Sequence, residues 1–312
     1  YNSDYRVKIY KGILVSFVGI SMLTSCFTGI ESTPRITKKD VMRNDAMIAS
    51  EASEIASRLQ PAPISQWDAG RRFLVTYAKI SLLFEKEPKI APGEIIVFDN
   101  IINEISIIGD EVAVLTFHKE NDSKKTPMRY KVRLPLSELP PSFTLPMSVD
   151  MDMVDAARKE LVGKEFYIIT SMRVDSLLTP VNKGRRCVPV RISNVTVGND
   201  DYPLRVDIID DLGRESSVAM TVGSSLSSTR NFDKIFVLEN PRLKYETISD
   251  TVWENIVNSR VTPGMTTIEC SLAIGTPKDI RKWHNGGSYF EGWVCDNGNY
   301  LIFIDGVLSE IH

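Results

Sequence analysis

Apolar and polar residues alternate in short runs along most of the chain, which predicts strands more often than helices. In the segment 63–148, corners marked by glycine, proline or aspartate separate these runs. The segment is therefore predicted to be a small antiparallel β-domain of the SH3-like kind, with the proline-rich stretch 135–146 as a linker or edge. The runs that we expect to be strands cover residues 72–77, 80–84, 94–98, 111–117 and 128–134.

A second group of apolar runs follows an expected short helix at 151–161 and predicts a second β-domain over 149–238. Residues 70–76 are similar to 163–170, and 80–83 are similar to 174–178. A duplicated β-domain is the simplest explanation, although any two strand pairs look alike at this length. Its further strands are expected at 188–192, 204–209 and 217–222.

The segment 239–312 carries two helix-start signals followed by β-rich runs. Ser249 and Asp250 are expected to cap a first helix, while Thr266 and Glu269 have the spacing of a capping box for a second, which ends at Gly275. The strands are expected at 292–295, 300–304 and 307–311. This order predicts two helices packed on an antiparallel sheet, so the whole chain is predicted to be of the α+β class.

A basic start and an apolar run precede Cys26. Lys8 and Lys11 are followed by the apolar run 12–23 and by the small pair 24–25 directly before the cysteine. A bilayer-spanning helix needs about 20 apolar residues, so this run is too short to span, but it has the form of a secretion leader. The alternatives are an ordinary secretory signal with a chance cysteine and a buried helix.

The leader hypothesis sets the remaining boundaries and the location. We expect residues 1–25 to be removed and Cys26 to be acylated, with palmitate among its acyl chains, which anchors the protein in a membrane. Residues 26–62 then form a tether and a helix over 37–59. The chain resembles lipoproteins of the Bacteroidetes type, and the weak acidic character after Cys26 favours the periplasmic side of the outer membrane.

The last quarter of the chain resembles a known family of small outer-membrane lipoproteins. The motifs that carry the resemblance are Gly264-Met265-Thr266, residues 273–277, Trp293, Phe303 and Asp305-Gly306. They are similar to those of the SmpA/OmlA family, also called BamE, an accessory subunit of the β-barrel assembly machinery. The resemblance implies a helix pair on a sheet and a role in envelope assembly. Of the run by which that family contacts lipid and the barrel subunit, only Tyr245 survives here, so lipid recognition is not carried over and a different partner is expected.

Charge and histidine content exclude several functions. The formal net charge is −3, so no basic field attracts nucleic acid. The three histidines, His118, His284 and His312, do not have metal-ligand spacing with cysteine or acidic residues, and we expect neither a metal nor a cofactor. The acidic pairs 150/152 and 210/211 lie at helix starts or turns, where aspartate caps backbone amides.

The cysteines leave two questions open. Cys187 follows two arginines, which lower a thiol pKa, so a cell-wall hydrolase with this nucleophile is one hypothesis, while a buried strand cysteine is the commoner explanation. Cys270 and Cys295 are the only pair that we expect could form a disulfide, and two buried free thiols are favoured over that bridge.

These observations together predict a lipid-anchored, non-catalytic envelope protein that acts as an interaction scaffold at the outer membrane. Its partners are the membrane, through Cys26, and one or more envelope proteins. The alternative is a peptidoglycan-binding protein that uses its SH3-like domains. Trp283 and His284, expected in a polar loop, are candidate partner-contact residues together with Tyr245.

Overall fold

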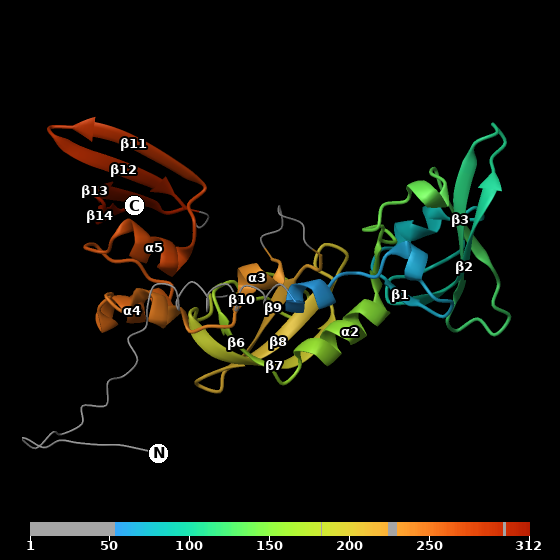
Figure 1. Cartoon of the computed structure of the whole chain (residues 1–312), viewed down its shortest axis with the longest axis horizontal. Coiled ribbons are helices and arrows are strands. Elements are labelled where there is room, and N and C mark those ends of the chain that lie inside the picture. Colours follow the sequence, from blue (N-terminus) through green and yellow to red (C-terminus); the bar gives the residue numbers. More distant parts are fainter. Residues whose placement is uncertain (1–53, 182, 224–229, 296–297) are drawn as a thin grey trace, which may run out of the picture. The chain divides into compact units, whose positions relative to one another are not determined.

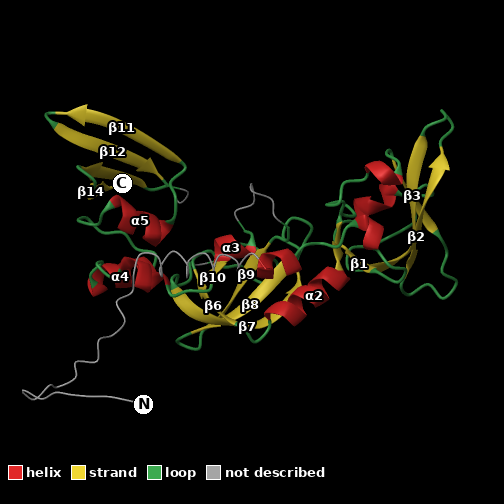
Figure 2. Cartoon of the chain, in the orientation of Figure 1, coloured by secondary structure: helices red, strands yellow, loops and turns green. Residues whose placement is uncertain are grey.

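The computed structural model describes residues 54–181, 183–223, 230–295 and 298–312 (Figures 1 and 2). The leader, Cys26 and most of the helix expected over 37–59 lie outside the described residues. Residues 54–58 are helical, and Ile55 and Leu59 are buried. Within the described residues, no helix combines the length and the apolar character that crossing a membrane requires.

The first sheet has five antiparallel strands in the order β4-β3-β2-β1-β5. Its core is aromatic, with the ring of Phe117 in contact with those of Phe73 and Phe98. The hairpin expected between the third and fourth strands is confirmed as β3–β4. The strands are β1 (Arg72–Val75), β2 (Ile95–Ile105), β3 (Glu111–Lys119), β4 (Met128–Val132) and β5 (Ser148–Asp150).

Two expectations for this segment are wrong. Residues 80–84 are not a strand: η2 (Ala78–Leu83) is a 3-10 helix whose Ile80 is fully buried, and only Phe84 forms an isolated bridge, with Tyr130. The stretch 135–146 is not a linker, because Leu139 and Leu145 are buried in the first core around η3 (Leu136–Glu138). An apolar turn of 3-10 helix has the composition of a short strand, which explains the first error.

The second sheet is also five-stranded and antiparallel, in the order β10-β6-β7-β8-β9. The expected helix is confirmed as α2 (Met151–Leu161), whose buried residues pack on β7 and close one side of this core. The strands are β6 (Glu165–Ile168), β7 (Val188–Val197), β8 (Leu204–Asp210), β9 (Glu215–Met220) and β10 (Phe236–Val237), the last preceded by α3 (Phe232–Ile235).

The two sheets correspond in detail. In the first sheet β1 lies between β2 and β5, and in the second sheet β6 lies between β7 and β10. In both sheets the first strand is therefore flanked by the second strand and by the last one. Gly70 N donates to Phe98 O at 2.8 Å, and Gly163 N donates to Ile192 O at 2.9 Å. In both sheets the register of the next strand pair shifts directly after the accepting residue. The first match found in the sequence therefore joins equivalent positions.

The second sequence match is out of step. Val174 N donates to Ser217 O at 2.9 Å, and Glu85 N donates to Arg129 O at the same distance. Val174 thus lies at the position of Glu85 and not at that of Ile80, with which the sequence match pairs it. Both are short, apolar, turn-flanked stretches, and their similarity in composition does not define the register.

The C-terminal segment is a four-stranded antiparallel sheet with two helices, as expected. Ser249 caps α4 (Asp250–Val257), and the Thr266–Glu269 capping box starts α5 (Thr267–Ile274), which ends at Gly275. The sheet contains one strand more than expected, β11. Its strands are β11 (Asp279–Asn285), β12 (Ser288–Val294), β13 (Tyr300–Ile304) and β14 (Val307–Ile311), in that spatial order.

The chain is therefore of the α+β class, with three antiparallel sheets and a buried core beside each. The second and third cores share an edge, because Val257 of α4 packs in the second core while Cys187, just before β7, packs in the third. Arg186 N donates to Val257 O at 3.0 Å across this edge. The residues around Cys187 thus belong to two cores at once.

Candidate functional site

A pocket of about 400 Å³ lies at the edge shared by the second and third cores, and we call it the Cys187 pocket. It is built by the loop before β7, by β10, by η4 (Pro241–Tyr245) and by α5. It brings together two residues that sequence reasoning selected for unrelated reasons, Cys187 and Tyr245. Prominent among the lining residues are Ile169, Arg186, Cys187, Phe236, Tyr245 and Leu272.

Cys187 is held in place by backbone contacts and is poorly suited to be a nucleophile. Its φ of 56° is unusual for a residue with a side chain, and its N–H donates to Ile168 O. Burial raises the pKa of its thiol, against the opposing effect of the Arg186 charge. The arginines before it therefore do not produce the lowered pKa that the hydrolase hypothesis requires.

Arg186 is the residue of this pocket that sequence reasoning missed. Its Nε is shielded from solvent and has no hydrogen-bond partner among the described residues. Burial lowers the pKa of its guanidinium, and within the described part of the chain its only favourable electrostatic contacts are with the Cys187 thiol. No sequence signal distinguishes it from Arg185 beside it, which pairs with Asp211 at the surface.

Tyr245 ends η4 and lines the Cys187 pocket with its ring stacked on Trp253, with 6.5 Å between the centroids. Arg242 lies over the other ring system, 5.0 Å from the centroid of Trp253, and its Nη1 donates to Tyr245 O at 2.8 Å. Tyr245 is therefore a partly buried wall of a pocket, and its surroundings differ from those of an exposed contact residue.

Trp283 and His284 lie on β11 and not in a loop, so the expected loop position is wrong. The turn is formed by Gly286 and Gly287, whose φ values are positive. The Trp283 ring is 37% exposed and stacks on Phe290 of β12 at 5.5 Å between centroids. All seven residues of β11 are exposed. The structure does not bring these two residues together with Tyr245, whose ring contact is Trp253.

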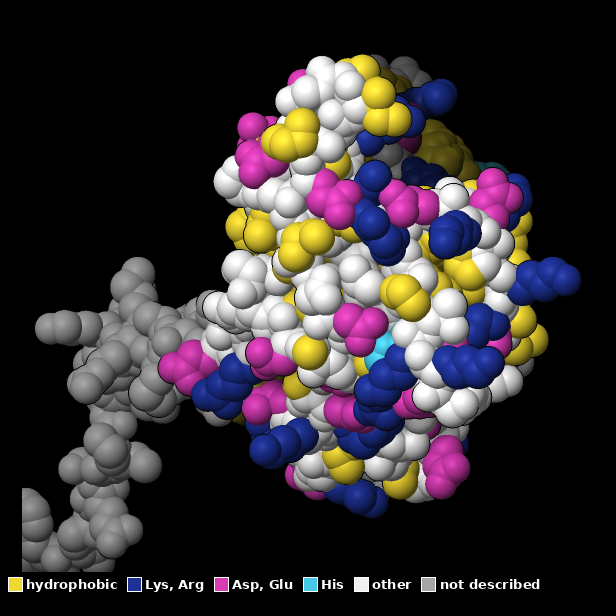
Figure 3. Space-filling model, turned by 90° about the vertical axis from the view of Figure 1, so that its right-hand side faces the viewer, with side chains coloured by type: hydrophobic (Ala, Val, Ile, Leu, Met, Phe, Trp, Pro, Cys, Tyr) yellow, Lys and Arg dark blue, Asp and Glu magenta, His cyan; other side chains and the backbone are white. Residues whose placement is uncertain are grey.

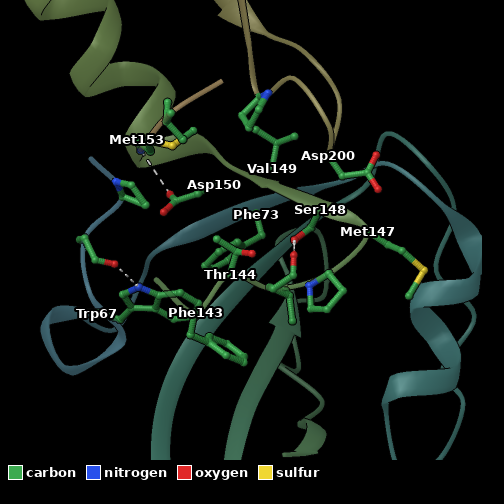
Figure 4. A pocket seen from close by; sticks show the side chains of 16 residues that line it. Trp67, Phe73, Phe143, Thr144, Met147, Ser148, Val149, Asp150, Met153 and Asp200 are labelled. Atoms are coloured by element: carbon green, nitrogen blue, oxygen red, sulfur yellow. Dashed lines mark hydrogen bonds between the residues drawn. The ribbon is translucent and has the colours of Figure 1, made fainter. Parts of the chain in front are cut away.

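A second cavity, of about 270 Å³, lies beside Trp67 and Asp150 (Figure 4). Trp67 packs against Phe73 at 4.9 Å and Phe143 at 6.0 Å between centroids, which gives the cavity an aromatic wall. Arg71 Nε donates to Asp150 Oδ2 at 2.8 Å beside it. The Asp150 carboxylate of this wall is thus already paired with Arg71.

Asp150 is a helix cap, as expected. Its Oδ1 accepts from the backbone N–H groups of Asp152 and Met153 at 3.1 and 3.2 Å, and the second bond is drawn in Figure 4. Burial raises the pKa of its carboxyl group despite the charge of Arg71. Asp210, of the second acidic pair, also caps a backbone amide: its Oδ1 accepts from the N–H of Leu212 at 2.9 Å in a turn.

The remaining candidate ligands are dispersed. His118 was expected at a strand edge, but it is buried in β3 with Nδ1 2.8 Å from Asp99 Oδ1. Among the described residues, no group of three or more histidine, cysteine or acidic side chains could hold a metal ion. Cys270 and Cys295 are both buried and form no disulfide with each other, and burial raises the pKa of the Cys270 thiol to about 12.

The face of the molecule shown in Figure 3 carries interspersed basic and acidic side chains with hydrophobic ones scattered among them. The exposed hydrophobic residues of the described chain include a cluster at the turn between β2 and β3: Ile105, Ile107 and Ile108. Sequence reasoning did not single out this turn.

The chain was compared with models of protein families and with curated protein sequences. No family model matches this chain, and no curated protein sequence matches it.

Proposed function

We propose that this chain is a lipid-anchored protein of the bacterial cell envelope that acts as a non-catalytic interaction scaffold at the outer membrane, on its periplasmic side. The location rests on the leader that ends at Cys26. The resemblance of the C-terminal segment to the BamE family supports a role in envelope or outer-membrane protein assembly, with a helix pair and sheet of the BamE-like kind.

One structural observation carries the scaffold role: β11 presents Trp283 on an exposed strand, supported from the neighbouring strand by Phe290. Large aromatic side chains that are fixed by packing but open to solvent are the usual anchors of protein interfaces. Because β11 pairs only with β12 among the described strands, its other edge is also available for contact.

The test is a photoreactive amino acid introduced at Trp283 in intact cells, with the same amino acid at Leu212 as the matched control. Leu212 is 64% exposed and lies in the β8–β9 turn. We expect position 283 to capture a defined envelope protein that position 212 does not. Absence of any adduct at 283, or identical adducts at both positions, would contradict the scaffold role.

Peptidoglycan binding is a second candidate, favoured by the strand order of the first two sheets. A long, bent second strand, a meander and a short 3-10 or helical turn before the last strand support an SH3-like description of both. Envelope domains of this kind hold wall peptides. The test is co-sedimentation of the full chain with purified peptidoglycan: retention supports this function, and its absence removes it.

A further inference from the structure

Arg186 is a charged group of the Cys187 pocket without a counter-ion among the described residues. Its Nε has no hydrogen-bond partner, and the neighbouring Cys187 thiol is uncharged at neutral pH because burial raises its pKa. A charge shielded from water without a partner destabilises the folded protein unless something neutralises it. The site therefore favours an external anion.

The other charged side chains of the pocket already have partners. Lys244 Nζ lies 3.7 Å from Glu239 Oε2, and Asp233 Oδ2 lies 3.4 Å from Lys234 Nζ. Arg186 remains as the one positive group of the described lining that is not offset, which fits a ligand with a single negative charge.

Most of the remaining lining is apolar, and this determines the body of the ligand. Phe236 of β10, Tyr245 of η4 and Leu272 of α5 come from three different elements, so the wall surrounds the space in front of Arg186. The volume of about 400 Å³ lies within the range of about 300–1,000 Å³ typical of small-molecule sites. A nucleotide or sugar phosphate would leave most of its polar groups unsatisfied here.

We propose that the Cys187 pocket binds a small alkyl carboxylate, such as a medium-chain fatty acid, with its carboxylate on the Arg186 guanidinium and its chain along the apolar wall. Guanidinium and carboxylate form charge-assisted hydrogen bonds, which are about twice as strong as neutral ones. The site is independent of the lipid anchor and of the scaffold surface on β11.

The experiment uses the full chain carrying Cys26→Ser, so that no attached acyl chain competes, with decanoate as the probe in isothermal titration calorimetry. We expect saturable binding of decanoate, and binding of 1-decanol that is at least tenfold weaker. Arg186→Gln should weaken decanoate at least tenfold, because a hydrogen bond to a charged group contributes about 1.5–3 kcal/mol. Lys159→Gln, which removes an exposed positive charge of α2 outside the lining, should change the affinity less than twofold.

Thermal unfolding separates a lost site from a lost fold. Because Arg186→Gln removes a half-buried charge without a counter-ion among the described residues, the unliganded variant should melt at the same temperature as the parent or higher. Decanoate should raise the Tm of the parent and not that of the variant. Equal decanoate affinity in parent and variant, equal affinity for decanoate and 1-decanol, or no binding to the parent at millimolar decanoate would overturn the proposal.

Discussion

Asp150 shows how one residue can serve two neighbouring sheets. It is the last residue of β5 in the first sheet, and its side chain caps α2, which packs on the second. Arg71, the residue before β1, forms an ion pair with the same carboxylate. The side chains of Arg71 and Asp150 are only 11% and 13% exposed. The Asp150 carboxylate thus accepts hydrogen bonds from Arg71 and from two backbone N–H groups at the start of α2.

We predict that Arg71→Met lowers the free energy of unfolding by about 3–5 kcal/mol at neutral pH, because it leaves the Asp150 carboxylate buried without its partner. The change is measured by urea denaturation. The matched control is Arg72→Met: Arg72 pairs with Asp155 in the open, with side chains 39% and 45% exposed, and should cost no more than about 1 kcal/mol.

The pH dependence of this loss distinguishes charge from packing. Burial already raises the pKa of Asp150, and loss of Arg71 raises it further, so the folded variant takes up a proton at higher pH than the unfolded chain. The stability of the variant relative to the parent should therefore recover as pH falls through that raised pKa. A deficit that is the same at every pH would show that only packing is lost.

Cys187 gives a second prediction at this scale. Its raised pKa and 7% exposure mean that little thiolate is present at neutral pH and that access is restricted. In the chain carrying Cys26→Ser, iodoacetamide should label Cys187 at least about tenfold more slowly in the folded state than in urea, as read by peptide mass spectrometry. Rapid labelling of the folded protein would revive the hydrolase hypothesis.

Single residues were predictable from the sequence where their role is local. The caps Asp150, Asp210 and Thr266 act on backbone amides within four residues, so spacing alone reveals them. Arg186 could not be found, because its burial results from the meeting of β10, η4 and α5, which are distant from it in the chain.

At the scale of elements, too, the expectations that hold are those that depend on neighbouring residues rather than on contacts between distant segments. The two C-terminal helices are bounded by a cap and a glycine and are found where expected, whereas the apolar stretch 80–84 forms a 3-10 helix because Ile80 reaches the core from that conformation. β11 was missed because all of its residues are exposed, and it therefore lacks the alternation that identifies a half-buried strand.

The capping box gives a prediction at this scale. Thr266 Oγ1 accepts from Glu269 N at 3.3 Å, and Glu269 Oε2 accepts from Thr266 N at 2.7 Å. Thr266→Ala should lower the free energy of unfolding by about 1 kcal/mol, measured by denaturant unfolding. Thr267→Ala, one residue inside α5, is the control and should have a smaller effect. Equal losses would show that the capping bonds contribute little.

For the whole molecule, the α+β class and the three groups of strands follow from the sequence, because each group has its own set of turn-bounded apolar runs. The equality of strand order in the first two sheets did not follow, since it depends on pairings between distant strands such as β1 with β5 and β6 with β10. A duplicated domain accounts for that equality, and we propose it on the matching bonds of Gly70 and Gly163.

The central claim of the account is that Cys26 becomes the acylated first residue of an envelope protein. The direct measurement is incorporation of radiolabelled palmitate in Gram-negative cells that produce the chain, followed by mass spectrometry of the mature protein. We predict label in the parent and in Cys187→Ser, no label in Cys26→Ser, and a mature chain that begins at Cys26. Absence of label in the parent, or a mature protein that retains its leader, would contradict the account.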